Sequence, residues 1–223
     1  MNTYDLLVPI SNEDASFYQQ LGNKLPVKVI PVGFDFSGVK YEEEKLLPDK
    51  LFYIGSLEWR PNQEGLIWFL DNCWTAIKKE HPQVKLYVAG RNSPKWLEQK
   101  LKDCEVNFVG EVDSSADFIE DKGIMIVPLL SGSGMRIKIV EAFMNSKAVV
   151  TTRVGAKGIP AIDNVHLLIA NESVDFAKKV MKLITDVNVL KSLTKNAFIF
   201  AKEHFDNEII SRELYEFYKA NIN

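Results

Sequence analysis

The 223-residue chain has the length of one large α/β domain, and its 46% hydrophobic residues suffice for a sizeable core. A formal net charge of −3 argues against nucleic-acid binding through a general basic field. Cys73 and Cys104 lack metal-ligand spacing, and no apolar run or leader pattern indicates membrane insertion, so we expect a cytoplasmic protein, with peripheral membrane contact left open.

Short apolar runs alternate with longer segments of helical periodicity along most of the chain. The apolar runs predict strands over residues 4–9, 27–31, 51–54, 85–89, 106–109, 124–127, 148–151 and 165–169. The periodic segments predict helices over residues 12–21, 62–79, 94–102, 114–121, about 135–145, 174–185, 188–204 and 206–220. A polar, acidic connector over residues 33–48 is the expected linker. This alternation predicts an α/β fold, a parallel sheet with helices on both faces.

In such sheets, ligands bind outside the carboxyl ends of the strands. Glycine follows four of the predicted strands there, as Gly55, Gly90, Gly110 and the pair Gly132/Gly134. A glycine allows a sharp turn and lets a ligand approach the backbone closely, although tight turns in any α/β protein use it as well. Four such loops at one edge indicate a binding site.

The segment 131–143 combines a glycine-containing loop with the start of a helix. Free N–H groups and the helix dipole favour an anion such as phosphate at that position. Arg136 and Lys138 add cations where the dipole disfavours them, so a bound anion would explain them; solvated surface charge is the alternative. Glu141, further along, could accept hydrogen bonds from a vicinal diol, although a helical glutamate is more often solvated.

Two further arginines lie near strand ends, and several known motifs are missing. Arg91 follows Gly90 directly, and Arg60 precedes the helix that Asn62 is expected to cap; each arginine could also be a plain surface charge. A dinucleotide fingerprint after the first strand, a Walker loop and a histidine pair at metal spacing are all absent from the sequence. We therefore disfavour a dinucleotide oxidoreductase and expect no metal site.

Taken together, the loops resemble one family. The matching stretches are FYIGSLEWRPNQEGLIWFL, VKLYVAGRNSP, VNFVGEV, IVPLLSGSGMRIKIVEAF and AVVTTRVGAKGI, in the family's order. The chain resembles the C-terminal, nucleotide-sugar-binding half of a group 1, family 4-like retaining glycosyltransferase of the GT-B fold. The resemblance covers roughly residues 50 to 220 and implies a Rossmann-like donor domain over 48–223. Residues 1–47 look like the end of the family's N-terminal domain plus the linker.

The resemblance also implies roles for individual residues. Glu141 would bind the donor ribose, and the backbone of residues 134–137, which includes Gly134, Met135 and Ile137, would meet the diphosphate. Gly55 begins the first phosphate-facing loop, and the backbone of Val112 would contact the base. The remaining expected contacts come from the strand ends and the two loops beside them: Gly90, Arg91, Arg60 and Ser133.

This sequence departs from the family pattern in three places. The first glutamate of the family's paired motif falls on Ser133, so the usual contact to the donor sugar is missing. The family's phosphate-binding Arg and Lys fall on Ser56 and about Glu64, where Arg60 and Arg136 would substitute. The N-terminal acceptor domain is almost wholly absent, which implies a shortened enzyme that is inactive alone.

The resemblance therefore predicts transfer of a sugar from a UDP- or GDP-type donor to a hydroxyl, with retention and without a tightly bound cofactor. Arg136, Lys138 and Glu141 would carry the donor chemistry. The acceptor would be bound by the missing domain, and a lipid-linked acceptor at a membrane is compatible with this reading. Polysaccharide biosynthesis is the expected setting. The alternative is a non-catalytic nucleotide-binding or scaffold domain of the same fold.

Overall fold

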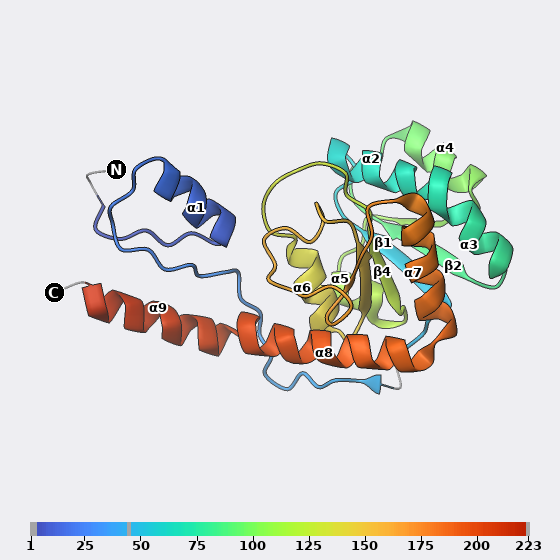
Figure 1. Ribbon diagram of the computed structural model, residues 1–223. Helices are drawn as coiled ribbons and strands as arrows, with labels where there is room; N and C mark the ends of the chain where they lie inside the picture. The colour runs from blue at the N-terminus through green and yellow to red at the C-terminus, as the bar shows by residue number, and fades with distance from the viewer. Residues whose placement is uncertain (1–3, 44–45, 222–223) are drawn as a thin grey trace.

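The computed structural model describes residues 4–43 and 46–221 and has one parallel sheet at its centre (Figure 1). Its six strands lie in the order β3-β2-β1-β4-β5-β6, and every neighbouring pair is parallel. The strands are β1 (Lys50–Ile54), β2 (Lys85–Ala89), β3 (Asn107–Gly110), β4 (Ile124–Val127), β5 (Ala148–Thr151) and β6 (Leu168–Ile169). This order confirms the predicted Rossmann-like α/β fold.

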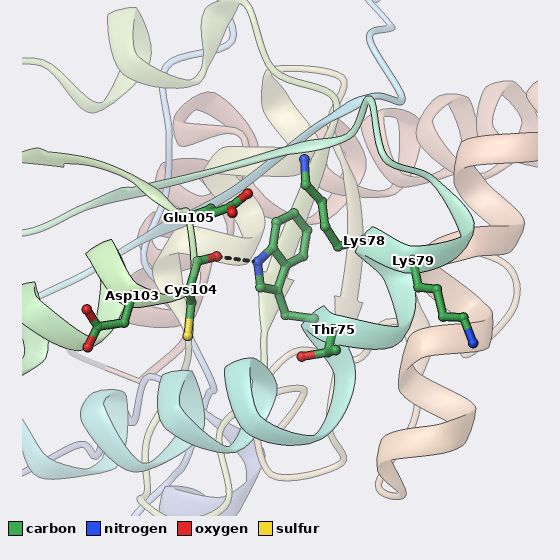
Figure 2. Close-up of a pocket in the computed structure, with 7 residues that line it drawn as sticks. Thr75, Lys78, Lys79, Asp103, Cys104 and Glu105 are labelled. Atoms are coloured by element: carbon green, nitrogen blue, oxygen red, sulfur yellow. Dashed lines mark hydrogen bonds between the residues drawn. The ribbon is translucent and has the colours of Figure 1, made fainter.

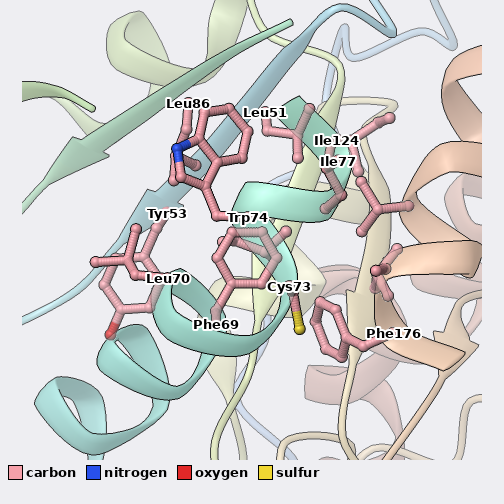
Figure 3. Close-up of a cluster of buried hydrophobic side chains, with 14 of the residues drawn as sticks. Leu51, Tyr53, Phe69, Leu70, Cys73, Trp74, Ile77, Leu86, Ile124 and Phe176 are labelled. Atoms are coloured by element: carbon pink, nitrogen blue, oxygen red, sulfur yellow. The ribbon is translucent and has the colours of Figure 1, made fainter. Parts of the chain in front are cut away.

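Side chains alternate along the strands between two separate cores. Leu51 and Tyr53 of β1 belong to one core, and Phe52 between them belongs to the other. β4 repeats the pattern, with Ile126 in the first core and Met125 in the second. Figure 3 shows the first core, where the aromatic rings of Phe69, Trp74 and Phe176 pack over the sheet. Both faces of a parallel sheet must be covered in this way to keep its apolar residues from water.

Helices cover both faces, as the alternation predicted. The first core is closed by α2 (Arg60–Phe69), the π-helical turn η2 (Leu70–Trp74), α3 (Thr75–Glu80), α4 (Lys95–Asp103) and α7 (Ser173–Thr185). The second core is closed by α5 (Ser115–Glu120), α6 (Ile137–Met144) and most of α8 (Val187–Phe205). The predicted helix 62–79 is thus one run from residue 60 to 80 with a π-helical turn inside it.

Two predictions about element ends need correction. Asn62 does not cap α2: it is buried within the first turn and donates from Nδ2 to the Ser56 carbonyl at 2.8 Å, while Trp59 holds the N-cap position. The strand predicted over 165–169 shrinks to β6, because the N–H groups of Val165 and His166 both donate to the Ile162 carbonyl and form a turn.

The strands predicted over residues 4–9 and 27–31 are wrong as extended elements. Leu7 and Val27 form a single parallel bridge between these segments. Two strands that have no further neighbours in the described chain do not form a stable sheet. The intervening helix α1 (Asn12–Gln20) buries none of its residues.

The chain ends return to this N-terminal segment. Phe34 donates its N–H to the Phe205 carbonyl at 2.7 Å, and the Asn207 N–H donates to the Phe34 carbonyl at 2.9 Å. Helix α9 (Asn207–Asn221) then runs away from the sheet (Figure 1), and Glu213 on it pairs with Lys28 at 2.7 Å. Helix α9 likewise buries none of its residues.

Gly90 supports the sheet edge through a close backbone approach. A methyl group on its Cα would overlap the Gly55 carbonyl oxygen, a backbone atom with no freedom to withdraw. We expect Gly90→Ala to lower the free energy of unfolding by about 3 kcal/mol in urea denaturation. Gly38→Ala is the control: it has open space but a φ of +74°, so the loss should stay near ~1 kcal/mol. Equal losses in the two variants would contradict the close approach.

Candidate anion site at the carboxyl edge of the sheet

The carboxyl ends of β1, β2 and β3 meet through their glycines. The Gly55 N–H donates to the Ala89 carbonyl at 3.2 Å, and the Gly90 N–H donates to the Gly110 carbonyl at 2.8 Å. The structure thus brings the predicted residues Gly55 and Gly90 together at one edge. The loop after β4 and the start of α6 reach the same edge, because Lys138 bonds to Ile54 there.

The loop after β4 is shaped by two glycines in left-handed conformations. Gly132 has a φ of +110° and Gly134 a φ of +83°, values that side chains rarely adopt. Helix α6 therefore begins at Ile137, two residues later than predicted, and Arg136 stands at its N-cap position. Among the described residues, none accepts a hydrogen bond from the N–H groups of residues 134–137.

Lys138 lies half-buried beneath the Gly55 loop. Its Nζ donates to the Ile54 carbonyl at 3.0 Å and stands 4.5 Å from the centroid of the Tyr53 ring. Burial, with a smaller contribution from the nearby charge of Arg136, lowers the pKa of Lys138 to about 7. No carboxylate in the described chain forms a salt bridge with it.

Arg136 is buried more deeply, at 9% exposure, and is only partly satisfied. Its Nη1 donates to the Ser133 carbonyl at 2.6 Å, and its Cζ lies 5.4 Å from the centroid of the Trp59 ring. Its Nε and Nη2 have no partner within residues 4–43 and 46–221, and neither has the buried hydroxyl of Tyr53. Burial lowers the pKa of Arg136 and raises the pKa of Tyr53. Buried polar atoms without partners are rare in native proteins and indicate an absent ion or ligand.

Glu141 extends the site along α6. The Ser115 hydroxyl, at the first position of α5, donates a hydrogen bond to Oε1 of Glu141. Glu141 is half-buried, and its second oxygen forms no hydrogen bond within the described chain. Val112, in the loop between β3 and α5, packs against the second core. The carboxylate is thus held in place with one oxygen available.

The remaining predicted residues lie at the rim. The Arg91 side chain is 63% exposed, with Nε 4.0 Å from Glu58, and Arg60 is exposed on the first turn of α2. Ser133 and Ile137 are exposed, whereas Met135 is buried. The structure therefore separates a buried pair, Arg136 and Lys138, from arginines in solvent.

Sequence reasoning missed three residues of the site: Tyr53, Trp59 and Ser115. Tyr53 sits two positions before Gly55 and so shares a strand face with it, which is the signal that could have found it. Trp59 and Ser115 carried no comparable signal, because their contacts cross long stretches of sequence.

Other features of the described chain do not compete with this edge. A cavity of about 420 Å³ lies between α3 and the residues preceding β3, lined by Thr75, Lys78 and Glu105 among others (Figure 2). The Trp74 indole inside it already donates to the Cys104 carbonyl at 2.9 Å. Within residues 4–43 and 46–221, no group of three or more His, Cys, Asp or Glu side chains could hold a metal ion. Nor is any helix in those ranges long and apolar enough to cross a membrane.

Solved structures show the same fold in glycosyltransferases. HepE of Anabaena, crystallised with UDP, matches with a TM-score of 0.80 at 20% identity, over 97% of this chain and 64% of that one. A point mutant of TarM from S. aureus, crystallised with Fondaparinux, α-GlcNAc-glycerol and UDP, matches with a TM-score of 0.79 at 14% identity, over 97% of this chain and 44% of that one. At these identities the likeness establishes the fold as one half of a GT-B enzyme.

Sequence comparison adds the family. An uncharacterized 44.6 kDa protein in the cps region of Klebsiella pneumoniae is 29% identical over 96% of this chain and 56% of its own length. The chain therefore spans less than two thirds of these relatives. The model of the group 1 glycosyl transferases matches residues 48–186. The chain belongs to the group 1 glycosyl transferases.

Proposed function

We propose that the carboxyl edge of the sheet binds a nucleoside-diphosphate sugar, with the diphosphate at Arg136, Lys138 and the N–H groups of residues 134–137. The observation that carries this proposal is the pair of buried cations that have no carboxylate partner in the described chain. An unsatisfied buried polar group costs about 1–3 kcal/mol, and more when it is charged. A diphosphate would supply charge and acceptors to the orphaned N–H groups together.

Residues on either side would hold the rest of the donor. The free oxygen of Glu141, with Ser115 holding the other, suits the two ribose hydroxyls. The Val112 backbone and Arg91 would border the base, and Gly55, Gly90 and Arg60 the phosphates. The UDP present in the HepE and TarM crystals supports a UDP-type donor over a GDP-type one.

The proposed reaction is transfer of a sugar to a hydroxyl acceptor with retention of configuration. The bond between the sugar and the diphosphate breaks, and negative charge develops on the leaving group. Arg136, Lys138 and the start of α6 are placed to stabilise that charge, a form of catalysis that needs preorganised groups. The position of the K. pneumoniae relative in a cps region supports a role in polysaccharide biosynthesis, with the acceptor in the cytoplasm or at a membrane.

The acceptor site would belong to a preceding domain, of which residues 1–47 are the end and 48–223 the donor-binding partner. Exposed apolar side chains on the N-terminal segment support this: Tyr4 is 71% exposed, Phe17 57% and Leu21 61%. Residues of this kind usually lie in a core or an interface. We propose that this chain alone binds the donor and transfers nothing.

Titration calorimetry with UDP and GDP tests the proposal. We expect saturable, one-site binding of UDP and weaker binding of GDP. An absence of saturable binding to either nucleotide would favour the non-catalytic scaffold instead. Retention is tested on the full-length enzyme, by NMR of the anomeric proton of the product; an inverted product would contradict it.

Glu141 provides a prediction specific to the ribose. We expect Glu141→Gln to weaken UDP binding about tenfold, because a hydrogen bond to a charged group contributes about 1.5–3 kcal/mol. Binding of 2′-deoxy-UDP should weaken less, since one of its two hydroxyls is already missing. Glu98→Gln on the exposed face of α4 is the matched control and should leave both affinities unchanged. Equal losses for the two nucleotides would contradict the ribose contact.

A further inference from the structure

Two aromatic side chains touch the two buried cations of the site. Trp59 contacts the guanidinium of Arg136, and Tyr53 lies beneath the ammonium of Lys138. We infer that Trp59 and Tyr53 are positioning residues, which hold these cations by cation–π contact and leave their charge available to the ligand. The inference rests on the proposed function, because it concerns how the diphosphate site is prepared.

The physical reason lies in what else could hold a buried cation. A carboxylate would fix Arg136 firmly but would also neutralise it and occupy its N–H groups. An aromatic face attracts a cation through the ring quadrupole and leaves every N–H free. Arg136 uses Nη1 on the Ser133 carbonyl, while Nε and Nη2 keep their donors. The contact with Trp59 therefore orients the guanidinium without competing with an anion.

Trp59 is held closely against the loop that carries the arginine. A methyl group at Gly132 would lie 3.0 Å from Cη2 of Trp59 and 2.8 Å from Nη2 of Arg136. The indole is nevertheless 41% exposed, so it contributes less to the core than a buried tryptophan would. Its backbone carbonyl accepts from Asn62 and Gln63 at the start of α2, which anchors the ring at the edge of the site.

Tyr53 holds Lys138 from below. The tyrosine is fully buried, and its hydroxyl lies 3.5 Å from where a Cβ on Gly55 would stand, while Lys138 Nζ lies 3.2 Å from the same point. Ring, ammonium and the bare backbone of Gly55 therefore converge. The Ile54 carbonyl takes one ammonium proton, and the other two are left for a ligand.

A double-mutant cycle between Trp59 and Arg136 tests the first contact. NMR titrations of the full 223-residue chain would measure UDP and uridine separately, since uridine lacks the diphosphate. We expect Trp59→Leu to weaken UDP binding about tenfold and uridine binding less than about twofold. In an Arg136→Gln background the same change should cost less than about twofold, because the tryptophan acts through the arginine. Trp59→Phe should recover affinity to within about threefold of wild type.

Trp96→Leu on α4, where the indole is 52% exposed, is the matched control and should change neither affinity. Equal weakening of UDP and uridine, or an undiminished loss in the Arg136→Gln background, would overturn the role of Trp59. If Trp59→Leu does not fold, the cycle run with Trp59→Phe decides by the same criterion. Wild-type protein that fails to bind UDP would instead overturn the proposed function, and the inference with it.

For Tyr53, two variants separate ring from hydroxyl. Tyr53→Phe keeps the ring under the ammonium and should bind UDP within about twofold of wild type. Tyr53→Leu removes the ring and should weaken UDP about fivefold or more, with uridine unchanged. The loss should disappear in a Lys138→Met background. A loss in Tyr53→Phe as large as in Tyr53→Leu would overturn the role of the ring.

Discussion

Replacing Lys138 with methionine should abolish tight nucleotide binding and, at the same time, leave the free protein as stable as wild type or more so. Lys138 is a half-buried cation whose partners are one carbonyl and one ring, with no opposing charge in the described chain. Apolar replacement of buried charge is often neutral or stabilising by about 1–4 kcal/mol; we expect a gain of up to about 2 kcal/mol at pH 7. UDP affinity should fall at least about thirtyfold, as a charge-assisted contact is lost.

The stability gain should depend on pH in a defined direction. Because burial lowers the pKa of Lys138 to about 7 from an ordinary 10.5, the unfolded chain binds a proton between these values that the folded chain does not. The penalty of the buried charge is therefore complete below pH 7 and is relieved as the pH rises toward 10.5. Urea denaturation at about pH 6 and about pH 9 should show the advantage of Lys138→Met changing between the two conditions, because the wild-type folded lysine is charged at the lower pH and neutral at the higher.

The advantage of Lys138→Met should be larger at the lower pH and should shrink at the higher one.

Lys122 offers a matched control for this substitution. It is also buried, at 5% exposure, but it pairs with Asp121 at 2.7 Å and donates to the Phe118 carbonyl. Lys122→Met should lower the free energy of unfolding by about 1 kcal/mol and leave UDP affinity unchanged. If both lysine variants lose stability alike, the absence of a charged partner at Lys138 does not have the consequence argued here.

The affinity for UDP should fall as the pH rises above 7. A bound diphosphate favours the charged form of Lys138, whose pKa is about 7 in the free protein, so binding at higher pH must take up a proton. Between about pH 7 and 9 we expect a loss of up to about tenfold per pH unit. Calorimetry in HEPES and in Tris, whose ionisation enthalpies differ, should report an uptake approaching about one proton per UDP near pH ~8.5.

The same titrations on Lys138→Met provide the control. Without the titrating ammonium, the variant should bind weakly and with a flat profile between about pH 7 and 9. A wild-type affinity that stays constant over this range would show that Lys138 is charged in the free protein or does not meet the diphosphate.

Much of the fold follows from local pattern. Apolar runs that end in Gly55, Gly90 and Gly110 predicted the strands of the sheet and the edge where they meet, because strand length and glycine position are local properties. Misplaced cations near a helix start also identified Arg136 and Lys138 as candidates. What the pattern could not convey is burial: the contact between Lys138 and Ile54 joins residues 84 positions apart.

Elements that depend on distant neighbours were predicted less well. Residues 4–9 have the composition of a strand but reach only one bridge, at Leu7, because no further strand flanks them among the described residues. The partner of Glu141 is Ser115, 26 positions away, and nothing in either local segment indicates the other. Tyr53 was taken for an ordinary strand residue, since a buried hydroxyl without a partner is visible only in three dimensions.

Mapping UDP onto the amide resonances of the protein tests the central claim most directly. If the diphosphate lies between the glycine loops and α6, saturable shift changes should concentrate in residues 55–60, 110–115 and 131–141, and Arg136→Gln should abolish those of the last group. Changes centred instead on the cavity beside Trp74 and Cys104, or no saturable change at all, would contradict the account.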